Sequence, residues 1–168
     1  MACASINSSR SNEEKYCFFA IAGKLADAAR GAGMETGVEY YRINGVPHIL
    51  ANVAWGNDQR YRAVWNSKRI PYAHFTQRDP DWALRFHVWR MDWDETAIRL
   101  YLDDELLNEV SLSATVNGSI GRYLNPFNRP QFILLNLALG GDNGGTIDDT
   151  AFPMRYEIDY VRVYQQTN

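Results

Sequence analysis

Two glutamates that could do chemistry lie close together in the stretch GMETGVEYYR, residues 33–42. Glu35 and Glu39 are four positions apart in a segment that is typical of a β-strand, so both carboxyls face the same side. Gly37 lies between them on that side. Two such carboxyls can serve as the acid and the base or nucleophile of a reaction, or they can be solvated surface charges. The residue types alone leave both interpretations open.

Other side chains could bind a ligand rather than react with it. Trp55 closes the run HILANVAWG, and we expect it either to line a site or to pack under a loop. Trp65 is expected to line the same site or to pack in the core. Asn136 interrupts the apolar run FILLNLALGG, and a polar amide there needs a partner, which is either a ligand or neighbouring backbone. Trp89 and Trp93 are predicted to pack in the core or between sheets.

The composition predicts a soluble globular chain of one domain over residues 1–168. Of the 168 residues, 46% are apolar and 22% are charged, and the net charge is -3, a usual balance for globular domains. Lys and Arg are spread among Asp and Glu, so we expect no nucleic-acid partner. No apolar run approaches ~18 residues, so we expect no membrane-spanning helix. We expect a monomer.

Cysteine usage and the N-terminal sequence leave the compartment undetermined. Cys3 and Cys17 either form one disulfide or remain separate thiols, and two cysteines do not define a framework. The start MACASINSSR lacks a charged segment followed by an apolar segment, so no signal peptide is visible.

The elements that must position these side chains are predicted to be strands. A two-residue Asn44-Gly45 signal predicts a hairpin between 35–43 and 48–56, and Asp103-Asp104 predicts another within 97–112. Asp79 and Pro80 predict a short helical turn over 79–85. The remaining strands are predicted over 15–25, 60–66, 86–94, 130–141 and 154–165.

So many strands with almost no helix predict an all-β sandwich or jelly roll with two packed antiparallel sheets. A concave outer face could carry the surplus aromatic residues, since the chain has five Trp, ten Tyr and seven Phe. Aromatic rings stack on sugar faces and carboxylates accept hydroxyl hydrogen bonds. We therefore expect a polysaccharide or oligosaccharide as the partner.

Three blocks in order resemble glycoside hydrolase family 16, the laminarinase and lichenase group: FHVWRMDWDETAIRLYLDDELLNEV, NPFNRPQFILLNLALGGDNGG and FPMRYEIDYVRVYQ. YYRINGVPHILANVAWG resembles the segment that follows the family's catalytic strand, and residues 5–25 resemble its early strand pair. The resemblance implies a concanavalin-like jelly roll with a sugar-binding concave sheet. It also implies retaining endo-hydrolysis of β-glucan, of the β-1,3 or β-1,3-1,4 type, and an extracellular or periplasmic location.

The family's catalytic motif is Glu-x-Asp-x-Glu, or Glu-x-Asp-x-x-Glu with a bulge: nucleophile, supporting Asp and acid/base. Glu39, directly before Tyr40, matches the acid/base. Without a bulge, Glu35 takes the place of the nucleophile and Gly37 that of the Asp. With a bulge, Met34 and Thr36 take these places. The supporting Asp is missing in both registers, which predicts reduced activity.

A second difference from the family lies N-terminal to the motif. Only ADAARGA, residues 26–32, separates Leu25 from Gly33, where the family carries a Trp-Pro-containing strand. The family's opening strand is also missing ahead of Ala4. The sequence therefore looks like the family with a shortened N-terminal portion and one strand deleted.

The resemblance also implies a metal position. No cofactor is expected for the reaction, but Asp159, in the run DYVRVY, matches an Asp that holds a structural calcium in several family members. Calcium requires further oxygen ligands, which the N-terminal part supplies in the family. His48, His74 and His87 show no metal-ligand spacing, and structural roles are expected for them.

Three functions remain open at this point. The leading hypothesis is a β-glucanase-like hydrolase with impaired activity. The second is a sugar-binding jelly roll without catalysis, and the third is a truncated, inactive remnant.

Overall fold

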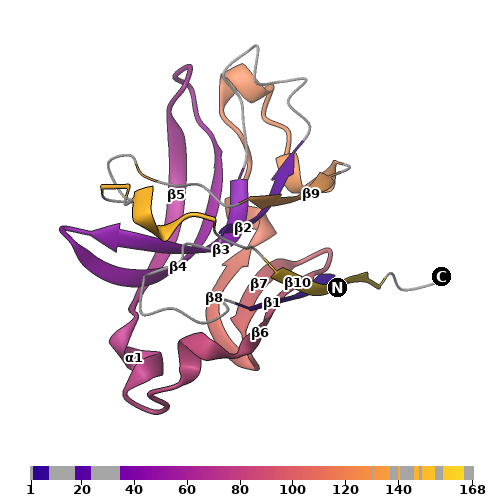
Figure 1. Ribbon diagram of the computed structural model, residues 1–168. Coiled ribbons are helices and arrows are strands. Elements are labelled where there is room, and N and C mark those ends of the chain that lie inside the picture. The colour runs from indigo at the N-terminus through magenta and orange to yellow at the C-terminus, as the bar shows by residue number, and fades with distance from the viewer. Residues whose placement is uncertain are drawn as a thin grey trace.

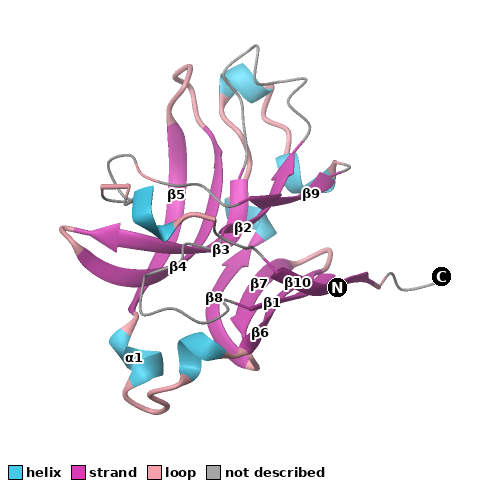
Figure 2. Ribbon diagram, viewed as in Figure 1, coloured by secondary structure: helices cyan, strands magenta, loops and turns pink. Residues whose placement is uncertain are grey.

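The structure, a computed structural model, describes residues 2–7, 18–23, 35–129, 131–136, 140, 146–147, 149–153 and 157–164. Strands dominate it and the helices are short (Figure 2). The strands are β1 (Ala2–Asn7), β2 (Phe18–Gly23), β3 (Glu35–Ile43), β4 (Val46–Gly56), β5 (Ala63–Pro71), β6 (Phe86–Trp93), β7 (Ala97–Leu102), β8 (Glu105–Ser111), β9 (Gln131–Asn136) and β10 (Glu157–Val163). The helices are α1 (Ala73–Thr76) and the 3₁₀ turns η2 (Trp82–Leu84), η3 (Leu112–Ala114), η4 (Ser119–Gly121), η5 (Pro126–Asn128) and η6 (Asp149–Ala151).

The described strands form two antiparallel sheets (Figure 1). One sheet has the strand order β10-β1-β6-β7-β8, and the other has the order β5-β4-β3-β2-β9. Strands β3 and β4 contact β7 and β8, so the two sheets face each other. The predicted all-β sandwich is confirmed. The described part of the chain contains no helix long and apolar enough to cross a membrane.

Both predicted hairpin turns are present and have a local cause. Asn44 and Gly45 have φ values of 51° and 79°, the left-handed conformation that a two-residue hairpin turn of this type requires. They join β3 to β4 in continuous register from Ile43 with Val46. Asp103 has φ 48° and begins the turn between β7 and β8.

The core lies between the sheets. β3 and β4 contribute Val38, Tyr40, Ile49, Ala51, Val53 and Trp55. Facing them are Trp89, Met91, Ile98, Leu100, Leu102, Leu107 and Val110 of β6, β7 and β8. Along β4 and β7 these apolar residues recur at every second position, because successive side chains of a strand project to opposite faces.

Some predicted boundaries are wrong. The strand predicted over 60–66 begins at Ala63 and runs to Pro71, because Arg62 N–H closes a turn onto Gln59 O at 3.3 Å. The helical turn predicted over 79–85 is η2, which Asp79 does not cap; its N-cap residue is Asp81. Helix α1 was not predicted.

Candidate active site

The two candidate catalytic glutamates lie on strand β3, facing away from the core. Val38 and Tyr40 of β3 belong to the core cluster between the sheets, so the alternate positions 35, 37 and 39 lie on the other side of the strand. Paired residues of antiparallel strands share a face. The register therefore extends this side of the sheet, here called the outer face, from β3 across β5, β4, β2 and β9.

Three rows of paired residues cross the outer face. The first row contains Arg69, Leu50, Glu39, Phe18 and Asn136. The second contains Ser67, Asn52, Gly37, Ala20 and Leu134. The third contains Trp65, Ala54, Glu35, Ala22 and Phe132. The two glutamate rows thus flank one row whose β3 position has no side chain.

The pairing of β3 decides between the two possible motif registers. β3 pairs with β4 without interruption from Glu35 opposite Ala54 to Ile43 opposite Val46, so this ladder has no bulge. Thr36, the bulged-register substitute for the supporting Asp, is 1% exposed on the core side. By strand parity, Thr36 therefore does not share a face with Glu39, whereas positions 35 and 37 do. Met34 lies outside the described residues.

Glu39 is buried although it lies on the outer face. Its residue is 4% exposed, and its partner Leu50 on β4 is 6% exposed. For Glu35 the backbone alone is described, and its side chain lies outside the described part of the structure.

The two tryptophans predicted to bind substrate differ in placement. Trp55 is 9% exposed and belongs to the core cluster, so the prediction that it lines the site is wrong. Side chains alternate along β4, and Trp55 lies on the same side of the strand as the core residues Ala51 and Val53. Trp65 is 52% exposed and shares the row of Glu35 on the outer face. Trp89 belongs to the core cluster and the partly buried Trp93 packs against it, which agrees with the predicted core or inter-sheet packing.

Asn136 and Asn52 are the amide residues of the outer-face rows. Asn136 lies in the row of Glu39, two strands away, and its side chain lies outside the described part of the structure. Asn52 was missed by the sequence reasoning. It lies opposite Gly37 and is 4% exposed. The signal was present, because Asn52 interrupts the apolar run ILANVAW just as Asn136 interrupts its own run.

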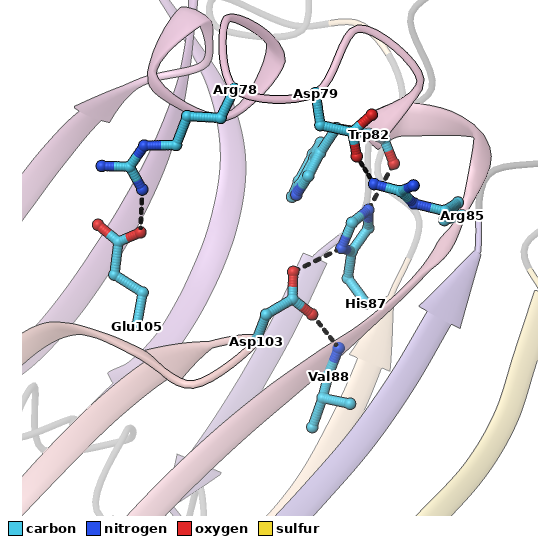
Figure 3. Close-up of polar contacts among 8 residues, drawn as sticks. All are labelled: Arg78, Asp79, Trp82, Arg85, His87, Val88, Asp103 and Glu105. Carbon is cyan, nitrogen blue, oxygen red and sulfur yellow. Dashed lines mark hydrogen bonds and ion pairs between the residues drawn. The ribbon is translucent and has the colours of Figure 1, made fainter.

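A polar cluster lies on the other sheet, where the turn before β6 meets the β7–β8 hairpin (Figure 3). His87 is 7% exposed and stacks on Trp82. Its Nδ1 lies 2.7 Å from Asp103 Oδ2 and its Nε2 2.5 Å from Trp82 O. Both partner atoms are hydrogen-bond acceptors.

The carboxyl of Asp103 has a shifted pKa. Burial by itself raises the pKa of Asp103, but hydrogen bonds from His87 and from Val88 N–H outweigh it and lower that pKa. Nearby, Glu105 accepts from Arg78 at 2.9 Å and contacts His74 Nε2 at 2.7 Å. These contacts connect the segment between β5 and β6 to the β7–β8 hairpin. They give His74 and His87 the structural roles expected for them.

The predicted calcium position is not supported by the described residues. Asp159 is exposed on β10, and no group of three or more His, Cys, Asp or Glu gathers within the described ranges. The segments expected to supply carbonyl oxygens lie largely outside those ranges. Calcium therefore remains a prediction. The Cys3–Cys17 pairing also lies outside the described side chains.

The sequence is similar to curated β-glucanases over part of their length. It is 30% identical over 136 residues to a β-glucanase of Rhodothermus marinus, covering 77% of this chain and 47% of that protein. It is 28% identical over 109 residues to a β-1,3-glucan-binding protein of Penaeus monodon, covering 56% of this chain and 30% of that protein. The chain thus spans less than half the length of these relatives. No family model matches the chain.

Solved structures show the same fold. The laminarinase catalytic domain of Thermotoga maritima matches 99% of this chain and 64% of its own with a TM-score of 0.66 at 22% identity. A structure from work on endo-acting O-glycanases of human gut bacteria matches 98% of this chain and 56% of its own, with a TM-score of 0.73 at 23% identity. The chain has the jelly-roll fold of these glycosidases, and its homologues include β-glucanases and glucan endo-1,3-β-glucosidases.

Proposed function

We propose that this chain binds β-glucan on the outer face and hydrolyses it with retention of configuration, with Glu39 as acid/base and Glu35 as nucleophile. The observation that carries the proposal is the unbulged pairing of β3, which puts both residues on one face with Glu39 buried. The similarity to a β-glucanase over 77% of the chain supports the substrate class. The linkages would be β-1,3 or mixed β-1,3-1,4.

The reaction needs two carboxyl groups about 5–5.5 Å apart. Glu35 would attack the anomeric carbon while Glu39 gives its proton to the leaving oxygen. Glu39 would then take a proton from the water that releases the sugar from Glu35. Residues i and i+4 of a strand are roughly 13 Å apart at Cα, so the two side chains must lean towards each other over the middle row.

The proposed activity is weak because Gly37 occupies the middle position. A carboxyl there would couple electrostatically to its neighbours and help to separate their two pKa values. Glycine supplies neither charge nor hydrogen bond.

A second candidate function is sugar binding without hydrolysis. The observations that favour it are Gly37 and the exposed indole of Trp65 in the row of Glu35. The similarity to a protein named for β-1,3-glucan binding agrees with it.

Reducing-end release from laminarin and mixed-linkage β-glucan separates the two candidates. The purified chain is compared with Glu39→Gln, Glu35→Gln and a control, Glu95→Gln, whose side chain is exposed in the β6–β7 turn. We expect slow turnover that falls about 10²–10⁴-fold in Glu39→Gln, falls in Glu35→Gln and is retained in the control. Absence of turnover with measurable oligosaccharide binding would favour the binding function. Turnover at ordinary enzyme rates would contradict the reduced activity.

Thermal unfolding addresses the third function considered, an inactive remnant. One cooperative transition is expected for a packed sandwich. A broad, non-cooperative transition together with absence of sugar binding would favour the remnant.

A further inference from the structure

A second surface adjoins the outer face at the end where β4 leads into β5. It consists of Arg60, Tyr61 and Arg62 of the β4–β5 loop and of Arg122 and Tyr123, which follow η4, and is here called the basic rim. Figure 1 shows both segments at the same end of the molecule. The β4–β5 loop begins directly after the paired residues 56 and 63, which lie about 6.6 Å beyond the row of Glu35 along the strands.

Hydrogen bonds and one glycine fix the two segments of the rim against each other. Gly118 N–H donates to Gly56 O at 3.2 Å, and Gly56 N–H donates to Asn117 Oδ1 at 2.6 Å. Asp58 Oδ1 accepts from Ser119 N–H at 2.7 Å. A Cβ at Gly118 would lie 2.4 Å from a backbone carbon of the β4–β5 loop, so only glycine permits this approach. The rim is therefore a preformed surface to which both segments contribute.

The rim is positively charged although the whole chain has a net charge of -3. Residues 56–72 and 112–125 contain one acidic residue, Asp58, and five basic residues, namely Arg60, Arg62, Lys68, Arg69 and Arg122. The hydrogen bond from Ser119 N–H holds the pKa of Asp58 below its ordinary value, so this one carboxylate is already engaged within the loops.

The three rim arginines are exposed, and none forms an ion pair with another residue that the structure describes. Guanidinium groups stay charged at all ordinary pH values and bind oxyanions through two parallel hydrogen bonds. Such a group of unengaged guanidiniums on a preformed surface fits an anionic ligand.

Two exposed tyrosines accompany the arginines in a costly backbone conformation. Tyr61 and Tyr123 have φ values of 58° and 55°, in the left-handed region that bulky residues rarely adopt. They are 79% and 69% exposed, so packing in the core does not explain why tyrosine occupies these positions. Residues held in such conformations cluster at ligand sites. The two phenol rings offer flat faces on which sugar rings can stack.

We propose that the basic rim binds a polysaccharide that carries sulfate or carboxylate groups, with the arginines contacting these anions and the tyrosines stacking on the sugar rings. The polysaccharide as occupant rests on the proposed sugar-binding function, because a sugar chain that leaves the outer face past Trp65 reaches the rim. The inference requires no hydrolysis. A nucleic acid fits less well, since its binding proteins carry extended basic surfaces and a basic overall charge.

The test uses a β-1,3-linked glucose hexasaccharide in three forms: unmodified, O-sulfated, and oxidised to carboxylates at the primary hydroxyls. Calorimetry measures binding to the full chain carrying Glu39→Gln, so that the ligand is not consumed. We expect a charged form to bind at least about tenfold more tightly than the unmodified form. This preference should shrink between about 50 mM and about 500 mM NaCl. The form that gains more identifies the anionic group as sulfate or carboxylate.

Removal of the rim charge tests the arginines. Replacing all three rim arginines by glutamine should reduce the preference for the charged form to less than about threefold. The matched control combines Arg78→Gln, Arg85→Gln and Arg129→Gln, which remove the same charge from exposed positions outside residues 56–72 and 112–125. Exposed ion pairs contribute little to stability, so the control should stay folded and keep the preference.

Glycine substitutions separate a ligand contact from a structural role for the tyrosines. Glycine adopts positive φ without steric cost, so Tyr61→Gly and Tyr123→Gly should keep or raise the melting temperature. Binding of the charged hexasaccharide should nevertheless weaken about three- to tenfold in each. Asn44→Gly, at an exposed position with φ 51° in the β3–β4 turn, is the control and should bind like the parent. Weaker binding in step with lower melting temperatures would contradict the contact with sugar.

The outcomes distinguish this inference from the proposed function. Equal binding of the three hexasaccharides overturns the inference, as does an equal loss of preference in the rim variant and its matched control. An oligothymidylate that binds more tightly than both charged hexasaccharides overturns it in favour of a nucleic acid. Hydrolysis of laminarin by the unmutated chain without any preference for a charged form contradicts the inference alone. A preference that depends on the rim arginines, without any hydrolysis, retains the inference and contradicts the hydrolase.

Discussion

At the scale of single residues, the middle row decides how well the two glutamates can work. The pair proposed for catalysis, Glu35 and Glu39, needs two different protonation states at the same pH. Nearby charges and hydrogen bonds create such differences. In this chain the middle β3 position has neither, and the nearest described polar group in that row is the neutral amide of Asn52.

Gly37→Asp is therefore expected to raise the rate of laminarin hydrolysis at least about tenfold, since it restores a carboxyl between the two others. Positive φ values among the described glycines occur at Gly45 and Gly140, so φ at Gly37 is outside the positive range that disfavours residues with a side chain. Gly37→Ala is the control, because it removes the strand penalty of glycine without adding charge. An equal gain in both variants would contradict the electrostatic reason.

Trp65→Ala is expected to weaken hexasaccharide binding by about three- to tenfold, the range that one aromatic contact supplies. The indole is 52% exposed, so the melting temperature should change little. Binding is measured by calorimetry. Phe86→Ala, which removes an exposed ring from the other sheet, is the control. Equal losses in both variants would show that Trp65 has no specific role.

At the scale of elements, the sequence predicts what depends on local geometry. The β3–β4 hairpin follows from Asn44 and Gly45, whose preference for positive φ is a property of the residues themselves. Trp55 faces the core because its side of β4 packs against the other sheet. Which side of a strand packs in this way is decided by tertiary structure. The run HILANVAWG is apolar at almost every position, so its alternation carried no signal for the inward side.

The β7–β8 hairpin should contribute pH-dependent stability through Asp103. The pKa of Asp103 is lower in the folded state than in the unfolded state. The stabilisation that Asp103 provides is therefore present above the ordinary carboxyl pKa, and it is lost as the pH falls through the lower folded pKa. Asp103→Asn should therefore reduce the loss of unfolding free energy between about pH 6 and about pH 3. Urea denaturation of the parent and of Asp103→Asn at both pH values measures the change in unfolding free energy.

Asp104→Asn serves as the control for this measurement, because Asp104 is the next residue in the turn and its side chain is fully exposed. An unchanged pH dependence in Asp103→Asn would contradict the role assigned to the contact between Asp103 and His87. A similar change in both variants would point to the net charge of the turn instead.

At the scale of the whole molecule, the sheet that contains β6, β7 and β8 packs against the core side of β3 and β4 and so supports the outer face. Burial of apolar side chains supplies most of the attraction between the sheets, but it does not specify their registry. Asn108 on β8 crosses the core: its Nδ2 donates to Ala51 O of β4 at 2.9 Å and to Asn66 Oδ1 of β5 at 3.2 Å. Ala51 lies directly before Asn52, so this contact supports the middle row.

The sequence could not have assigned this contact. Asn108 and Ala51 are 57 positions apart, and their pairing depends on how two separately formed hairpins stack. The position of Asn52 is different, because the predicted two-residue turn at Asn44-Gly45 already fixes the register that sets Asn52 opposite Gly37. A polar residue in an apolar run signals a need for a partner, but it does not identify the partner.

Asn108→Ala is expected to lower the free energy of unfolding by about 1–3 kcal/mol, because it leaves Ala51 O buried without its partner. Urea denaturation measures the change, and Asn128→Ala, at an exposed position in η5, should change it by less than about 0.5 kcal/mol. Because Ala51 precedes Asn52, hexasaccharide affinity should fall as well, at temperatures where the variant remains folded. A full loss of stability with unchanged affinity would show that the inter-sheet contact holds the sandwich together but does not position the outer face.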